Sequence, residues 1–501
     1  MESLESVECN PPPLVEEPAT TAAPGSSREL IGLATPLILS QSFMTVQVFL
    51  DTVLLSKHDP YEMAASFPAV MWFWLPFGLL QVTAGYTSTF VAQYTGAGRP
   101  QRVGPAVWQG IHFAIIAGIA MLVLVPTAPF LIGLGGHSEV LQDLEVKYLR
   151  CLAFAGMPML IMAAINGLFS GRGQTWTVLG IEAFGTGVNV ALALVLIFGW
   201  GDTIPELGIT GAGIATAVGS WASALLAVVL FLRPKLQREF NTLAGWPLES
   251  DLFHRLLRFG GPAGLQVFLD VLVFHLFTQM IGRLGDEAMG ATTLTVRLNM
   301  VALLPLLGLG QAVCILVGQR LGGDRPDLAE KSAYTGLRWA FGYVCVIAFV
   351  YLAFPHWLVS IFAGEHGADE FAKVATIVPK LLICVAIYTL ADAVNLTFAF
   401  ALRGAGDTKF VSLLTFAVAW PVMVVPTFIS VYVGASVYWA WAFATAHIVA
   451  MAFCFVWRFR TGKWKSMRVI EAAPPDAVAP DAIAAGEPPI VLSRAADNNH
   501  Q

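Results

Sequence analysis

The chain has 501 residues, of which 56% are hydrophobic and only 12% are charged. In soluble domains about a quarter of the residues are charged, so this composition excludes a water-soluble globular protein and is typical of a helical membrane protein. The formal net charge is −6 at pH 7. Because nucleic-acid binding needs basic clusters on an exposed face, we expect no nucleic-acid partner.

The two ends of the chain differ from the rest in composition. Residues 1–28 hold five Glu and a run of three Pro, without the basic start and apolar stretch of a secretory signal peptide. Residues 466–501 are rich in Ala and Pro and show no periodicity. We therefore expect disordered tails over 1–28 and 466–501, and membrane insertion that relies on the first membrane helix.

Between the tails the chain alternates long apolar runs with short polar loops. A helix of about 20 apolar residues crosses the bilayer core, whereas strands of a membrane barrel would alternate over about ten residues. The pattern predicts an all-α integral membrane protein with twelve transmembrane helices, over residues 29–56, 62–95, 104–133, 142–170, 175–199, 209–233, 252–283, 287–320, 328–362, 369–402, 409–433 and 436–460.

The placement of Lys and Arg predicts the orientation, because cytoplasmic loops hold the excess of these residues. With the N-terminus inside, 19 of them stand at the inner ends and loops, among them Arg99, Arg172, Arg320 and Arg403. Six stand outside, namely Lys57, Lys147, Arg150, Arg283, Lys373 and Lys380. We expect a plasma or inner membrane protein with both termini in the cytoplasm.

The chain also contains an internal repeat at an offset of about 226 to 233 residues. Three ordered matches carry it: VAQYTGAGRP (91–100) with VGQRLGGDRP (317–326), Pro36 with Pro262, and SGRGQT (170–175) with RGAGDT (403–408). Two like-oriented six-helix lobes follow, related by an axis along the membrane normal. We place the N-terminal lobe and the start of the connecting loop at 29–245 and the C-terminal lobe at 246–465.

Charged residues at bilayer depth cost about 2.5 to 3.5 kcal/mol even on the mildest scale, so each one is a candidate site. On the first helix Gln47 and Asp51 share a stripe, and on the tenth helix Tyr388, Asp392 and Asn395 share one face. Further candidates are Glu182 and Asn189 on the fifth helix, Asp270 on the seventh, and Arg297 and Asn299 on the eighth. The alternative for each is a helix–helix hydrogen bond.

Signals of an enzyme are absent from the sequence. No G-x-S-x-G, H-E-x-x-H or G-x-x-x-x-G-K-[ST] pattern is present, and GAGIAT (211–216) lacks the strand and the final Gly of a dinucleotide-binding turn. The six cysteines stand singly, which favours packing over metal binding or disulfides. We expect no enzyme activity and no cofactor other than a coupling ion.

Five segments in order resemble the multidrug and toxic compound extrusion (MATE) family over about residues 29–460. They are ATPLILSQ leading to FLDT, the GAGRP loop, PELGITGAGIATA, ILVGQRLG and LRGAGDTK. The resemblance implies a cation-coupled antiporter with two six-helix bundles around a central cleft, in agreement with the repeat.

The same resemblance implies roles for individual residues. Asp51 matches the helix-1 carboxylate of coupling, Tyr388 and Asp392 match the helix-10 cation pair, and Asp270 stands where many relatives have Glu. Asn189 and Thr216 match an amide and a hydroxyl of the N-terminal lobe. The chain departs from the family at Ala193, where relatives often have Asp or Asn, and at Glu182, where a small residue is expected.

Together these features predict an H⁺- or Na⁺-coupled antiporter that exports amphipathic or cationic small molecules by alternating access. A Na⁺ ion would be held at Asp270, Tyr388 and Asp392, while Ala193 favours H⁺ as the coupling ion. Gln47, Glu182, Thr216, Arg297, Asn299 and Asn395 are expected in the substrate cavity. We expect a monomer in the lipid bilayer with an organic cation as substrate. The alternative is a lipid or lipid-linked oligosaccharide flippase, whose cleft would be rich in Arg and Lys.

Overall fold

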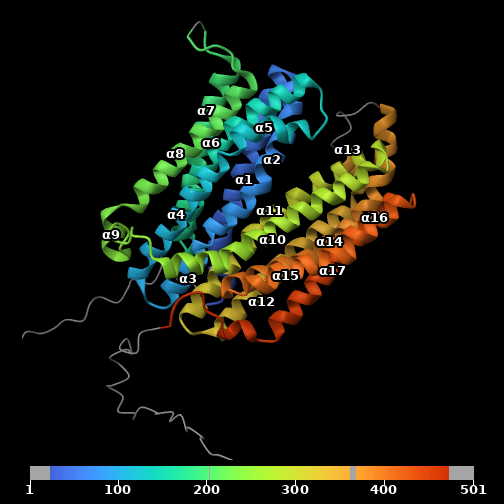
Figure 1. Ribbon diagram of the computed structural model, residues 1–501. Helices are drawn as coiled ribbons and strands as arrows, with labels where there is room; N and C mark the ends of the chain where they lie inside the picture. The colour runs from blue at the N-terminus through green and yellow to red at the C-terminus, as the bar shows by residue number, and fades with distance from the viewer. Residues whose placement is uncertain (1–22, 202, 361–367, 473–501) are drawn as a thin grey trace, which may run out of the picture. The chain divides into compact units, whose positions relative to one another are not determined.

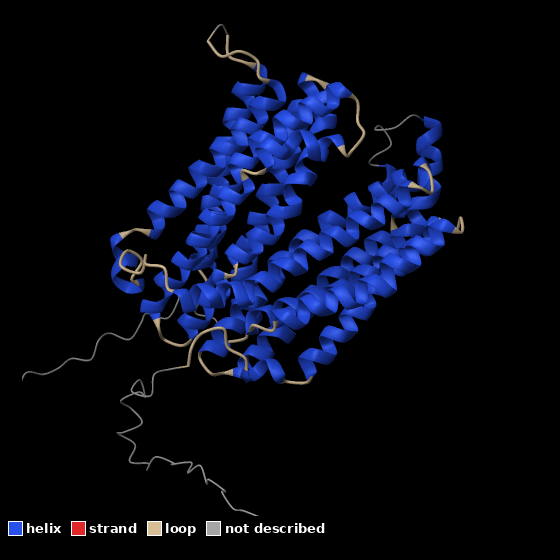
Figure 2. Ribbon diagram, in the orientation of Figure 1, coloured by secondary structure: helices blue, strands red, loops and turns tan. Residues whose placement is uncertain are grey.

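The computed structural model describes residues 23–201, 203–360 and 368–472. All regular elements in these ranges are helices, as Figure 2 shows. The helices in chain order are α1 (Ser27–His58), α2 (Pro60–Gly85), α3 (Thr87–Gly96), α4 (Val103–Met121), α5 (Leu124–Gly133), α6 (Glu139–Gly171), α7 (Thr175–Phe198), α8 (Gly208–Phe231), α9 (Pro234–Phe240), α10 (Ser250–Gly282), α11 (Asp286–Gly322), α12 (Pro326–Ala353), α13 (Pro355–Ser360), α14 (Ala368–Ala405), α15 (Thr408–Ala419), α16 (Val425–Tyr432) and α17 (Val437–Arg460).

The twelve membrane helices predicted from hydropathy are confirmed in the described residues. Four of them are not continuous α-helices. The second is divided between α2 and α3 at Tyr86, and the third between α4 and α5. The ninth ends before Pro355, and the eleventh contains a π-helical turn over Trp420–Val424 that includes Pro421. Proline lacks a backbone N–H and clashes with the preceding turn, which accounts for the last two interruptions.

Ordered structure extends a few residues into both predicted tails. Helix α1 begins at Ser27, with the Ser26 hydroxyl accepting from the Glu29 amide at 3.3 Å. At the other end Lys463–Ser466 form a 3₁₀ turn, in which the buried ring of Trp464 stacks on Phe459 with 4.5 Å between centroids. The parts of the predicted tails over 1–22 and 473–501 lie outside the described residues.

The helices pack as two groups that follow the chain order. In the N-terminal lobe (α1–α8), α6 packs against α2, α4 and α8. In the C-terminal lobe (α10–α17), α14 packs against α11, α12 and α17. The lobes meet through α2 with α10, and through α1 and α3 with α11. Figure 1 shows α3 and α12 near one end of the helices and α5 and α13 near the other.

We call the end at which α3, α6, α11 and α14 finish the basic end, because Arg99, Arg172, Arg320 and Arg403 stand there. One apolar cluster at this end includes residues of both lobes, from Leu30 and Ala92 to helices α11, α12, α14 and α17. Towards the opposite end, one cluster belongs to the N-terminal lobe and another to the C-terminal lobe. The two lobes therefore share a core at the basic end.

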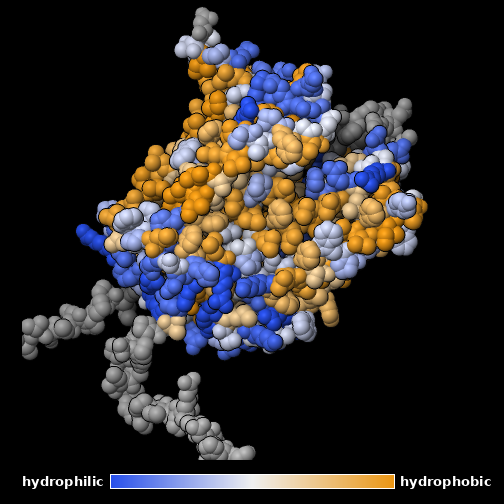
Figure 3. Space-filling view, in the orientation of Figure 1, coloured by the Kyte–Doolittle hydropathy of each residue, from blue (hydrophilic) through white to orange (hydrophobic). Residues whose placement is uncertain are grey.

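The outer surface of the helices is apolar. Large side chains such as Phe130, Leu225, Leu413 and Phe453 are at least 66% exposed. In Figure 3 hydrophobic residues cover the middle of the visible face, and hydrophilic residues gather towards the ends. In water this exposed area would be costly, whereas hydrocarbon solvates it, so the surface fits a protein embedded in a bilayer.

Helix α7 approaches α8 closely at Gly185. A Cβ atom there would lie 1.7 Å from the Ser223 hydroxyl oxygen, whereas a Cβ at Gly187 on the same helix meets nothing within 4 Å. We expect Gly185→Val to destabilise the fold by about 1–3 kcal/mol, as overpacked cores do. Gly187→Val is the control. Apparent melting temperatures of the purified variants test this, and equal values for the two would contradict the packing.

Candidate functional site

The C-terminal lobe brings together the predicted carboxylates of α10 and α14. Asp270 interacts electrostatically with Asp392 and Arg403, both on α14. Asp392 is buried with 4% exposure, whereas Asp270 is exposed. The Tyr388 hydroxyl lies near both carboxylates, one turn before Asp392. The three residues predicted as a cation site thus form one cluster, with one carboxylate accessible and one buried.

Two side-chain amides, one on α14 and one on α11, also belong to this cluster. Asn395 donates from Nδ2 to Asp392 Oδ1 at 3.0 Å, and Asn299 of α11 interacts with the Tyr388 hydroxyl. The side-chain oxygens of Asn299 and Asn395 are buried and have no hydrogen-bond partner among the described residues. Both amides were predicted for the cavity. Their free oxygens add two further acceptors for a cation or for a hydroxyl.

Arg403 is a cation that acts on Asp270, and the sequence alone placed it only among the basic residues of the inner helix ends and loops. Its guanidinium donates to Gln266 Oε1 at 3.2 Å and lies 4.9 Å from the Phe400 ring centroid. Gln266 stands one turn before Asp270 on α10. This spacing of four residues places the two side chains on one face, and it was the signal in the sequence that could have added Gln266 to the site. Arg297, predicted for the substrate cavity, is exposed on α11.

The N-terminal lobe holds a second, smaller polar cluster. Asn189 of α7 donates to Thr216 Oγ1 of α8 at 3.2 Å, and Tyr148 of α6 interacts with Thr216 and with Asp51 of α1. Asp51 is 7% exposed, and its Oδ1 has no hydrogen-bond partner among the described residues. Three predicted residues therefore meet here. Tyr148 was missed, because nothing in its spacing on α6 marks it as polar.

Three further positions considered in the sequence are Glu182, Gln47 and Ala193. Glu182 stands two turns before Asn189 on α7, where Asn166 of α6 donates to its Oε1 at 3.1 Å. Its contact is therefore a helix–helix hydrogen bond within the N-terminal lobe, the alternative weighed for it. Gln47 is half-buried on α1, one turn before Asp51. Ala193 is fully buried in an apolar cluster, so no polar group follows Asn189 one turn later.

The described residues contain no group of three or more His, Cys, Asp or Glu that could hold a metal ion. A cation in the C-terminal cluster would therefore depend on the two carboxylates together with phenol and amide oxygens. Such a set of groups suits the exchange of one cation for another. A buried carboxylate is costly to leave charged, and either a proton or a bound cation neutralises it.

Comparison with known proteins agrees with this architecture. The family model MatE matches residues 36–195 and 262–429, which is more than half of the chain. The chain belongs to the MATE family of transporters. It is 27% identical over 399 residues to the multidrug resistance protein NorM of Aliivibrio fischeri, covering 78% of this chain and 84% of NorM. A probable NorM of Shewanella oneidensis is 26% identical over 407 residues, which are 79% of this chain and 84% of that protein.

Solved structures share the fold of this MATE protein. A MATE protein in complex with MaL6 aligns over 88% of this chain and 97% of its own, with a TM-score of 0.79 and 17% identity. An outward-facing multidrug resistance MATE transporter gives 0.79 at 18% identity, again over 88% and 97%. At these identities the likeness concerns the fold alone. It confirms the all-helical membrane architecture predicted from the sequence.

The hydrogen bond from Asn395 to Asp392 generates a prediction. Bonds to charged groups contribute about 1.5–3 kcal/mol, so Asn395→Leu should lower the transport rate about tenfold or more by disturbing the buried carboxylate. Asn166→Leu is the matched control, because it removes an equivalent bond to Glu182 outside the cluster. Initial transport rates in proteoliposomes with equal amounts of protein compare the two. Equal losses would argue against a special role of the C-terminal cluster.

Proposed function

We propose that the protein exports small organic cations across the plasma membrane in exchange for H⁺, as a multidrug efflux transporter. One observation carries the proposal: the paired carboxylates Asp270 and Asp392, one accessible and one buried, at membrane depth. The relatives named multidrug resistance proteins support the direction and the broad substrate range. A monomer without a cofactor is sufficient for this exchange. In the proposed orientation the basic end and both termini are on the cytoplasmic side.

An amphipathic cation suits the surroundings of Asp270. Phe274 stands one turn after it on α10 and is 40% exposed, so its ring is available beside the carboxylate. A cation over an aromatic face gains about 0.5–2 kcal/mol, and the charge itself is balanced by Asp270. An anionic headgroup would instead meet two carboxylates, which weighs against the flippase alternative.

Protons compete with the substrate at the same groups. A proton neutralises a buried carboxylate, and the charge of an organic cation balances an accessible one, so occupation by one disfavours the other. In the N-terminal lobe the absence of a polar group at Ala193 leaves fewer oxygen ligands for Na⁺, which favours H⁺ there. The membrane potential contributes about 2.3 kcal/mol per net charge moved through 100 mV.

The role of the C-terminal carboxylates is tested by Asp392→Asn. This change keeps the shape of the side chain and can retain the contact with Asn395, but it removes the titratable charge. We expect gradient-driven efflux of a cationic dye to be lost while the purified variant keeps its melting temperature. Asp143→Asn, on the exposed part of α6, is the control and should export normally. Export by Asp392→Asn at the wild-type rate would place coupling elsewhere.

The coupling ion and the role of Asp51 are tested together. Because Asp51 is buried without a partner for Oδ1, its protonation removes an unbalanced charge, and Asp51→Asn should imitate the protonated state. We expect this variant to bind a fluorescent cation but to export it several-fold more slowly. In wild-type proteoliposomes a pH gradient alone should drive export. Export supported only by a Na⁺ gradient at fixed pH, or loss of binding in the variant, would refute this assignment.

A further inference from the structure

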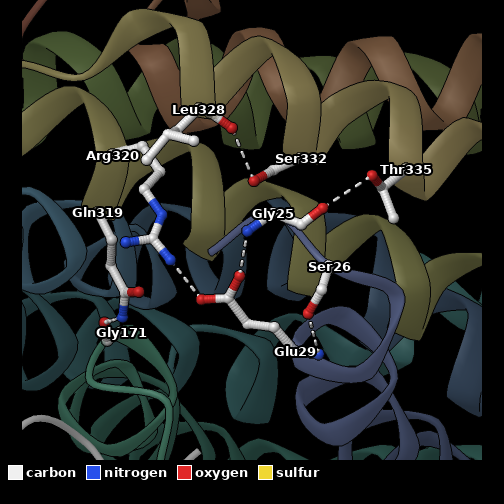
Figure 4. Close-up of polar contacts among 9 residues, drawn as sticks. All are labelled: Gly25, Ser26, Glu29, Gly171, Gln319, Arg320, Leu328, Ser332 and Thr335. Atoms are coloured by element: carbon white, nitrogen blue, oxygen red, sulfur yellow. Dashed lines mark hydrogen bonds and ion pairs between the residues drawn. The ribbon is translucent and has the colours of Figure 1, made fainter. Parts of the chain in front are cut away.

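Two glutamines cross between the lobes at the basic end in the same way. Gln93, at the end of α3, donates from Nε2 to the Gly404 carbonyl of α14 at 3.0 Å. Gln319, near the end of α11, donates from Nε2 to the Gly171 carbonyl of α6 at 2.8 Å, as Figure 4 shows. Each glutamine thus reaches from its own lobe to the last turn of a helix in the other lobe.

The two contacts are copies of each other in the internal repeat. Gln93 and Gln319 are the third residues of the matching segments 91–100 and 317–326, and Gly171 and Gly404 are the second residues of 170–175 and 403–408. Donor and acceptor are therefore both exchanged by the pseudo-twofold relation between the lobes. Because the contact is present in both copies of the repeat, it belongs to the way in which the two lobes meet at the basic end. It is not a peculiarity of one helix pair.

A pair of glycines permits this close approach. A Cβ atom at Gly96 would lie 1.8 Å from the Gln319 carbonyl oxygen, and one at Gly322 would lie 2.0 Å from the Gln93 carbonyl oxygen. These glycines each stand three residues after a crossing glutamine and are also equivalent in the repeat. Backbone atoms stand in the way in both cases, so no side chain can be accommodated while the lobes are closed.

Further bonds surround the pair on either side. The Glu29 carboxylate accepts from Arg320 across the lobes and from the Gly25 amide at 2.7 Å (Figure 4). The Val469 amide donates to Gln93 Oε1 at 2.8 Å, so both polar ends of the fully buried Gln93 are satisfied. Tyr86 donates from its hydroxyl to the Arg403 carbonyl at 2.7 Å.

We infer that Gln93 and Gln319, with Gly96 and Gly322, form a symmetric clasp that holds the basic end closed and sets the conformational equilibrium of transport. The inference rests on the proposed export by alternating access, in which this end must open to admit substrate. Opening breaks both glutamine bonds and separates the shared core. These residues act on the position of the lobes and do not bind substrate.

The size of the effect follows from the hydrogen bonds. Each buried bond contributes about 1 kcal/mol net, which corresponds to about a fivefold change in an equilibrium constant. Gln93→Ala and Gln319→Ala should therefore each raise the open fraction about fivefold, and the double variant about 25-fold if the bonds act independently. Gln109→Ala is the matched control, because Gln109 is also buried but donates to Pro105 of its own helix and to Pro247 in the segment before α10, and not to a helix end of the other lobe.

A native cysteine reports the opening directly. Cys314 of α11 is 5% exposed, and its Sγ lies 3.8 Å from Thr89 Oγ1 of α3, between the lobes. In a variant that keeps Cys314 alone, the initial rate of labelling by a water-soluble maleimide should rise by the factors above. Gly96→Ala and Gly322→Ala should raise it as well, whereas Gly32→Ala, where a Cβ meets nothing within 4 Å, should not. Unchanged labelling in the glutamine and glycine variants would overturn the clasp.

A crosslink separates this inference from the proposed function. The Thr89 Oγ1 of α3 lies 3.8 Å from the Cys314 Sγ of α11, so Thr89→Cys can be oxidised to a bridge between the lobes with the native Cys314. Oxidation should stop export, and a reductant should restore it. Export that continues with the bridge intact would refute alternating access itself. Arrested export together with unchanged Cys314 labelling in the glutamine variants would refute only the clasp.

Discussion

The contact between the lobes at the basic end is the interaction on which the rest of the structure depends. Two six-helix lobes share an apolar cluster at this end and hold separate clusters towards the other. Packed interiors switch between discrete arrangements and do not deform continuously. Under the proposed alternating access, the shared core therefore separates in one step when the basic end opens. Gly96 and Gly322 allow the backbones of α3 and α11 to approach closely. This approach excludes water from the carbonyls of Gly171 and Gly404, and the side-chain amides of Gln319 and Gln93 donate hydrogen bonds to them instead.

The two carboxylates of the C-terminal lobe stand on helices with different positions relative to the lobe interface. Asp270 stands on α10, which packs against α2 of the other lobe, while Asp392 stands on α14, which forms the centre of the C-terminal lobe. Arg403 follows Asp392 by three helical turns and contacts Gln266 of α10, and its carbonyl accepts from Tyr86 of the N-terminal lobe. These contacts connect the surroundings of Asp270 to the lobe interface, and the proposed coupling uses this connection.

The two polar clusters are unequal although the lobes are related by a repeat. The C-terminal cluster has two carboxylates, a phenol and two amides, whereas the N-terminal cluster has one carboxylate and a network of Asn189, Thr216 and Tyr148. The repeat is retained where the lobes must close on each other, at the glutamines and glycines. It is not retained in the two polar clusters, so the residues of the lobe interface follow the repeat and the residues of the polar clusters do not.

The sequence by itself determined the membrane class, the twelve spans, the internal repeat and most of the polar residues, because a membrane-spanning helix must be apolar over about 20 residues and each charge within it is conspicuous. Family resemblance was sufficient to predict that Asp270, Tyr388 and Asp392 lie together. Only the tertiary structure decided which residues pair. Helical spacing orders side chains on one helix, but it says nothing of what a neighbouring helix presents. Arg403 beside Asp270, Tyr148 beside Asp51 and Asn166 beside Glu182 therefore emerged only once the helices were packed. The crossed bonds of Gln93 and Gln319 likewise depend on how two lobes meet, which a pattern along one chain does not encode.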